Sequence, residues 1–189
     1  MNMNKIVAFI MLVMCLSNVS AQEITVDKVE QNGVRFIFCS EINPNKMFDK
    51  VKIFPFLSAF KTKEGEEIYS LMIRIPSSVP ISMNKDAMLL LKTGKDEVIQ
   101  LHSENECEDK IGRYLEAFKR LEYEITPTYV ISEEDLAKFK DGIKKIRFET
   151  VLKVYDKEFK SDKMGSAILY EYDLIKKAFE KKADIMDGF

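Results

Sequence analysis

The run Asn32-Gly33-Val34-Arg35-Phe36-Ile37-Phe38-Cys39 (residues 32–39) indicates how this chain folds. Asn-Gly is the strongest short-range turn signal between two strands. Before the turn, Ile24 and Val26 alternate with polar residues, and after it the chain is almost continuously apolar. The pattern predicts two antiparallel strands joined at Asn32-Gly33.

Two more hairpins are expected downstream. Residues 51–60 and 67–75 flank the polar turn 63–65, and residues 87–91 and 97–101 flank the turn 93–96. Three hairpins in succession favour an antiparallel sheet. Pro55 lies inside the first of these strands and predicts an edge or a bulge, because proline has no N–H to donate to a neighbouring strand.

Three segments carry helical signals. Ser103 and Glu106 match a capping box, and the apolar residues after them fall on one helical face (Cys107, Ile111, Leu115 and Phe118). The second helix is predicted from Ser132 to Gly142, and the third from Met164 to Phe179. Alternating apolar residues also predict an edge strand over 123–131 and a long strand over 146–154.

These elements together predict one domain. We expect residues 22–182 to form a single α+β domain with a mostly antiparallel sheet of about seven or eight hairpin-derived strands. About three helices should pack on one face of that sheet. Residues 183–189 are expected to form a flexible tail.

The first 21 residues have the features of a cleaved signal peptide. Lys5 precedes an apolar run, and Val19-Ser20-Ala21 offers the small residues that signal peptidase prefers, which would leave Gln22 as the first residue. The alternative is lipidation of Cys15, but Met14 is larger than the residue expected before a lipidated cysteine. We therefore expect an exported protein, periplasmic or secreted, without a lipid anchor or a transmembrane segment in its mature form.

Charge and motifs narrow the class of function. The chain has 29 basic and 31 acidic residues without the clustered positive charge that nucleic-acid binding requires. Glycine-rich phosphate loops, paired CxxC units, HExxH and nucleophile elbows are missing from the sequence. We expect no cofactor and favour a protein that is not an enzyme.

Two cysteines remain after the expected cleavage, Cys39 and Cys107. In an oxidising compartment they could form a disulfide, and the alternative is two separately buried thiols.

His102, the only histidine of the chain, is the candidate catalytic residue. It would serve a small hydrolase, although it also fits the end of a strand just before a helix cap. The acidic residues Glu104, Glu106 and Asp109 are candidate calcium ligands, but the spacing and central glycine of a calcium loop are lacking. Acids in the first turn of a helix explain them equally well.

Phe54, Phe56 and Phe60 are the candidate binding residues. The strand around them has apolar residues on both faces, so it is either a docking edge for a partner or a strand in the core. Exposure of Phe54 or Phe56 would favour docking, and burial of both would favour the core.

The site Val19-Ser20-Ala21-Gln22 and the stretches Tyr129–Leu136 and Gly142–Arg147 resemble small exported α+β proteins of unknown function from Bacteroidetes. This resemblance implies export and the fold class, and it implies no catalytic residues. We expect an exported, non-catalytic binding domain whose partner is another protein or an envelope component. The alternatives are a small envelope hydrolase using His102 and a subunit of an envelope assembly that docks through Ile185, Met186 and Phe189.

Overall fold

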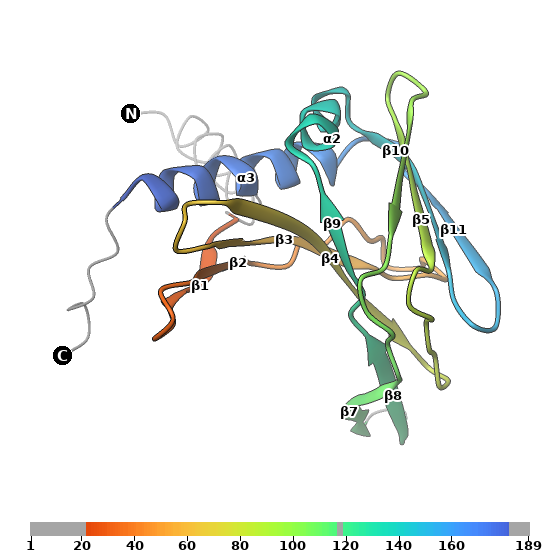
Figure 1. The fold of residues 1–189 in the computed structure, drawn as a ribbon. Coiled ribbons are helices and arrows are strands. Elements are labelled where there is room, and N and C mark those ends of the chain that lie inside the picture. Colours follow the sequence, from red (N-terminus) through yellow and green to blue (C-terminus); the bar gives the residue numbers. More distant parts are fainter. Residues whose placement is uncertain (1–21, 117–118, 182–189) are drawn as a thin grey trace, which may run out of the picture.

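The computed structural model describes residues 22–116 and 119–181, so the expected signal peptide, Cys15 and the C-terminal tail lie outside the described residues. The described chain is an α+β fold whose strands pair antiparallel in two sheets (Figure 1). The strands are β1 (Ile24–Val29), β2 (Arg35–Cys39), β3 (Phe54–Lys61), β4 (Glu67–Ser77), β5 (Met88–Thr93), β6 (Val98–His102), β7 (Lys110–Leu115), β8 (Arg120–Ile125), β9 (Thr128–Ile131), β10 (Ile143–Glu149) and β11 (Val154–Glu158). The helices are α2 (Glu133–Lys138), the short 3₁₀ helix η2 (Phe139–Asp141) and α3 (Gly165–Glu180).

The larger sheet has seven strands. Six of them follow the order β1-β2-β3-β4-β8-β7, and β9 pairs with β4 beside β8. The strand β4 is long enough to pair with β9 through Tyr69–Met72 and with β8 through Ile75–Ser77. The smaller sheet has the order β11-β10-β5-β6.

One hydrophobic core joins the two sheets and the helices. Leu57 and Leu71 of the larger sheet, Leu91 and Phe148 of the smaller sheet, and Ile175 of α3 are all buried in it. α3 lies along one face of β1–β4, and α2 sits beside its N-terminal half (Figure 1). The apolar residues that predicted the last helix therefore form the face of α3 that packs against the sheet.

All three expected hairpins are confirmed. β1 pairs with β2, β3 with β4, and β5 with β6. Gly33 has a φ of 83° and Gly65 a φ of 93° in the first two turns, which is the left-handed backbone that glycine adopts without strain. The predicted helices at 132–142 and 164–179 are also confirmed, with Ser132 capping α2 by accepting a hydrogen bond from the Asp135 N–H.

The helix predicted after Ser103 is wrong. Ser103 pairs with Ala87 and Tyr129 as an extension of β6, Cys107 pairs with Met83, and Lys110–Leu115 forms β7 against β8. The apolar residues happen to recur at helical spacing, but pairing with distant strands decides the local structure. Two α-helices, rather than three, are therefore present in the part of the chain that the structure covers.

Two other expectations need correction. The single sheet is divided into two, and the long strand predicted over 146–154 is a hairpin of β10 and β11. The turn between them is closed by Thr150, whose backbone N–H and hydroxyl both donate to the Lys153 carbonyl. Similarly, the strand predicted over 123–131 is broken at Pro127 into β8 and β9, because proline cannot donate to a ladder.

Candidate functional site

Among the described residues, α3 covers one face of the seven-stranded sheet and no element covers the other face. Side chains alternate between the two faces of a strand, so Ile37, Leu57 and Leu71 lie beneath α3 and are fully buried. Their neighbours in the sequence point to the opposite side. α3 is the one helix of the described chain that lies along β1–β4, and it occupies the first of these faces (Figure 1).

The uncovered face carries six half-buried apolar side chains, which we name the open sheet face: Phe36, Phe38, Phe56, Phe60, Ile68 and Met72. The strand register places them side by side. Phe60 lies between Phe36 of β2 and Ile68 of β4, and Phe56 lies opposite Met72. The rings of Phe36 and Phe60 are in contact, with centroids 6.1 Å apart.

Polar groups occur at one end and in the middle of the open sheet face. Arg74 lies opposite Phe54, and its guanidinium carbon is 4.3 Å from the centre of that ring. The same guanidinium donates two hydrogen bonds to Glu41, of 2.6 and 2.7 Å. Ser58 and Ser70 are neighbours across the middle of the face. A mainly apolar face with a paired charge at its border is the composition of a protein interface.

The three predicted binding residues, Phe54, Phe56 and Phe60, are all half-buried. Phe56 and Phe60 belong to the open sheet face, and Phe54 lies at its end, opposite Arg74. β3 pairs with β4 along its whole length but with β2 only from Ser58 to Lys61. The part of β3 that contains Pro55 is therefore an edge, which is one of the two outcomes that Pro55 predicted. Pro55 lies where β2 no longer pairs with β3, and there its carbonyl accepts a hydrogen bond from the Ile42 N–H. The role of the three phenylalanines in binding stays a prediction.

On the opposite face of the sheet, the carboxyl group of Glu171 on α3 is fully buried. Its Oε2 accepts a hydrogen bond of 2.7 Å from the Leu57 N–H, at a point where β2 has left β3. When the Gln22 side-chain amide is oriented with its nitrogen toward Glu171, this nitrogen lies 2.9 Å from Oε1 and donates to it. Burial raises the pKa of Glu171 to about 8, so this carboxyl is mostly protonated near neutral pH.

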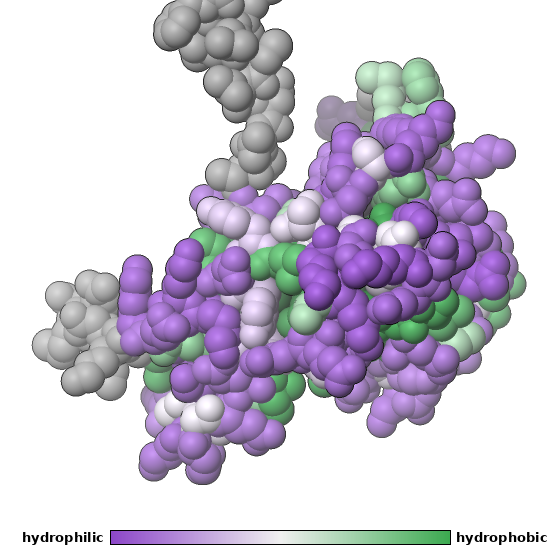
Figure 2. All heavy atoms as spheres, turned by 90° about the horizontal axis from the view of Figure 1, so that it is seen from above, coloured by the Kyte–Doolittle hydropathy of each residue, from purple (hydrophilic) through white to green (hydrophobic). Residues whose placement is uncertain are grey.

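Figure 2 views the molecule from the side of α2 and α3, and that surface is mostly hydrophilic. The helix side is therefore solvated, which is the ordinary outcome for an amphipathic helix on a sheet.

His102 ends β6 and is exposed. Its Nδ1 is 3.1 Å from the Asp86 carbonyl, and its Nε2 is 3.0 Å from the Gln100 amide nitrogen. The neutral tautomer with a proton on Nδ1 satisfies both contacts, since Nδ1 donates and Nε2 accepts. Both nitrogens are engaged by structural partners, which matches a strand-end role.

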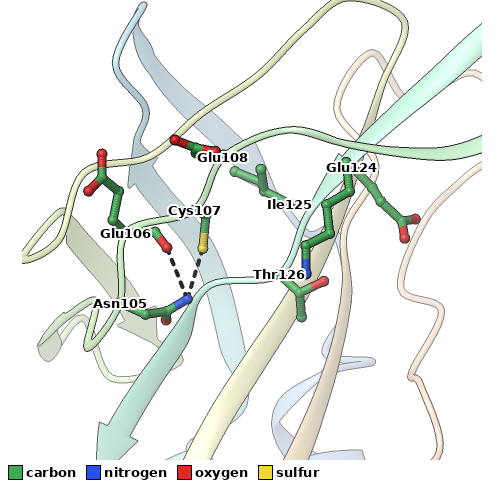
Figure 3. A pocket seen from close by; sticks show the side chains of 8 residues that line it. Asn105, Glu106, Cys107, Glu108, Glu124, Ile125 and Thr126 are labelled. Atoms are coloured by element: carbon green, nitrogen blue, oxygen red, sulfur yellow. Dashed lines mark hydrogen bonds between the residues drawn. The ribbon is translucent and has the colours of Figure 1, made fainter.

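A hollow of about 470 Å³ lies near the candidate calcium ligands, between the loop 105–108 and the end of β8. Figure 3 shows the Glu106, Glu108 and Glu124 side chains pointing away from one another, while Asn105 donates to the Glu106 carbonyl and the Cys107 sulfur. Glu104, Glu106 and Asp109 are all exposed. Within residues 22–116 and 119–181, no three histidine, cysteine or acidic side chains gather closely enough to hold a metal ion.

Of the two alternatives for the cysteines, the structure has the second: Cys39 and Cys107 are free, buried thiols at different places in the fold. Cys39 ends β2 under α3, with its sulfur 4.0 Å from the Glu171 carbonyl, and Cys107 pairs with Met83. Burial, assisted by the nearby Glu171 charge, raises the pKa of Cys39 to about 12. Burial also raises the pKa of Cys107, so neither thiol is activated as a nucleophile.

The sequence reasoning missed four of the six residues of the open sheet face. Phe36, Phe38, Ile68 and Met72 were assigned to strands but not to a surface. The available signal was that Phe36-Ile37-Phe38 is apolar without alternation, although its strand belongs to an antiparallel hairpin. Such a strand has apolar residues on both faces, and each face needs a cover.

No helix among the described residues has the length and apolar character needed to cross a membrane. No protein family, no curated protein and no solved structure matches this chain.

Proposed function

We propose that this protein is an exported, non-catalytic binding domain, and that the open sheet face is where another protein of the cell envelope docks. The observation that carries the proposal is the row of six half-buried apolar side chains on the sheet face opposite α3. Contiguous apolar patches of this kind mark interaction sites in soluble proteins. Flat aromatic side chains also contribute most of the binding energy at protein interfaces.

Two further features favour a protein partner. The face belongs to a sheet whose strand β3 pairs with β4 along its whole length and with β2 from Ser58 to Lys61, so it presents its rings without prior rearrangement. Arg74 at one end of it is already paired with Glu41, which supplies a polar border that keeps the free protein soluble.

The docking proposal is tested by photo-crosslinking in cells that make the protein. A benzophenone amino acid is placed at Phe56 on the open sheet face, and at Val98 of β6 as the matched control. Val98 is 58% exposed and belongs to the other sheet. We expect an adduct of discrete mass from position 56 and none from position 98.

A second variant keeps the outcome interpretable. Phe56→Glu should abolish an adduct formed from a photo-reactive residue at Phe36, because a charge within the docking surface is costly to bury. If the folded protein gives no adduct from position 56, or gives the same adduct from position 98, the open sheet face is not the docking site.

Export is proposed from the N-terminal pattern of Lys5, the apolar run and Val19-Ser20-Ala21. The mass of the protein recovered from outside the cytoplasm should correspond to a chain that begins at Gln22. A mass that retains residues 1–21 in the recovered protein would contradict the cleavage.

A further inference from the structure

We infer that the loop around Met47 and Phe48, between β2 and β3, binds the surface of an anionic lipid membrane. Met47 is 82% exposed and Phe48 is 90% exposed, which makes them the two most exposed of the large apolar side chains in the described chain. They are adjacent in sequence and belong to one turn, so both meet the solvent at the same place.

The turn that carries them is firmly built. The Asn45 side chain exchanges two hydrogen bonds with the backbone of Ile53, of 2.6 and 2.9 Å. The Lys46 N–H donates to the Asp49 carboxylate, and the Asp49 N–H returns a hydrogen bond to the Lys46 carbonyl. Met47 and Phe48 therefore lie at the tip of a closed turn, where hydrogen bonds hold the backbone on both sides of them.

A buried lysine fastens this turn to the smaller sheet. Lys157 of β11 is 7% exposed and donates to the Asp49 carboxylate and to the Val51 carbonyl. Ile42 and Pro44 are buried before the turn and anchor its start. A fold that orders a loop with a buried charge, while leaving a phenylalanine in water at its tip, presents that side chain for an external contact.

The charges around the tip indicate what kind of surface it binds. Lys46 and Lys50 flank the two apolar residues and are both exposed, and neither forms an ion pair with any residue of the described ranges. Asp49, the one acid in the turn, is held by Lys157. The tip therefore combines two apolar side chains with two exposed lysines, of which Lys46 also interacts electrostatically with Asp49.

That combination fits an interface of anionic lipids. An apolar tip enters the boundary between headgroups and acyl chains, while lysines remain at headgroup level and attract negative phosphates. A protruding tip can also insert into a lipid surface without a preformed cavity that matches its shape. Two apolar side chains and two lysines correspond to weak and reversible binding, comparable to that of a single acyl chain.

The first test measures co-sedimentation of the exported protein with phosphatidylglycerol vesicles and with phosphatidylcholine vesicles. We expect binding to phosphatidylglycerol that weakens as salt is added, and much weaker binding to phosphatidylcholine. The variant Met47→Ser/Phe48→Ser should bind at least about tenfold more weakly, because it removes the apolar contact. Both proteins carry the same N-terminus, so any lipid affinity of that end cancels in the comparison.

The charge contribution has its own variant. Lys46→Gln/Lys50→Gln should lower the affinity for phosphatidylglycerol about tenfold and leave the phosphatidylcholine result unchanged. All four positions are exposed, so circular dichroism melting curves should not change.

The second test locates the contact, and it uses the fact that the chain contains no tryptophan. The variant Phe48→Trp gives the chain its one fluorescent indole, which should shift to shorter wavelength with phosphatidylglycerol vesicles. The control Val98→Trp lies on β6, at the opposite edge of the four-stranded sheet from β11, and should not shift.

Three results would overturn the inference: no binding of the unaltered protein to phosphatidylglycerol, undiminished binding of the double serine variant, or an equal shift at position 98. The loop lies outside the open sheet face, so these outcomes are independent of the docking proposal.

Discussion

Glu171 is the residue whose ionisation should be visible in the stability of the protein. Its pKa is about 8 when folded, against an ordinary value of 4.5, because burial disfavours the charged form. Between those values the folded protein holds a proton that the unfolded chain has released. The free energy of unfolding must therefore fall as the pH rises through this window.

The expected result is that the unaltered protein loses a few kcal/mol of stability, on the order of 3, between about pH 5 and pH 8. Glu171→Gln keeps an acceptor for the Leu57 N–H and cannot ionise, so its stability should change much less over this range. Urea unfolding at several pH values measures both. Parallel curves for the two proteins would show that Glu171 is not the group responsible.

Asp49 is the second residue with a measurable role. A hydrogen bond from the buried Lys157 lowers the pKa of Asp49, so the carboxylate is ionised at neutral pH. Asp49→Asn leaves Lys157 buried without its counter-charge, which should lower the free energy of unfolding by about 1–3 kcal/mol.

The matched control is Asp156→Asn. Asp156 pairs with Arg147 and Lys145 on an exposed strand, where water screens the interaction, and no measurable loss is expected. Equal losses of unfolding free energy in both variants would contradict the argument that the buried Lys157 depends on its counter-charge more than the exposed partners of Asp156 do.

At the scale of the element, β3 shows how one strand serves two environments. Leu57 points toward α3 and is fully buried, whereas its neighbour Phe56 points to the open sheet face and is half-buried. Leu57→Ala should cost about 2–5 kcal/mol of unfolding free energy, because it leaves a cavity in the core. Phe56→Ala should cost only about 1 kcal/mol.

Chemical denaturation of the two variants checks this difference. If Phe56→Ala lowered the free energy of unfolding as much as Leu57→Ala, the open sheet face would belong to the core. The proposed docking surface would then lose its basis.

At the scale of the whole molecule, the smaller sheet meets the helical segment at a point where the two backbones come very close. The Gly94 N–H in the β5–β6 turn donates to the Gly142 carbonyl at the end of η2, at 2.9 Å. A Cβ at Gly94 would lie 1.8 Å from the Asp141 carbonyl oxygen, closer than any side chain tolerates. Gly94→Ala should therefore force the smaller sheet away from the helices.

We expect Gly94→Ala to lower the free energy of unfolding by about 2 kcal/mol in a single transition, because both sheets share one core. Gly65→Ala is the control: its φ is 93° but nothing lies within 4 Å, so only backbone strain of about 1 kcal/mol is expected. Separate melting of two parts in the Gly94 variant would contradict the shared core.

Local sequence by itself determined the features that depend on neighbouring residues. The turns at Asn32-Gly33, 63–65 and 93–96, the cap at Ser132, and the apolar face of α3 all follow from backbone preference and periodicity, and all are confirmed. The three candidate phenylalanines were predicted because their strand is too apolar for a solvated surface, and their role in binding stays a prediction.

Tertiary structure alone decided the features that depend on distant pairing. The segment after Ser103 carries helical spacing, yet it forms strand because Met83, Tyr129 and β8 supply partners for its backbone. The same applies to the division into two sheets, to the free thiols of Cys39 and Cys107, and to the open sheet face. Local preferences amount to tenths of a kcal/mol per residue, whereas a paired and buried backbone is a much larger contribution, so long-range contacts prevail where the two disagree.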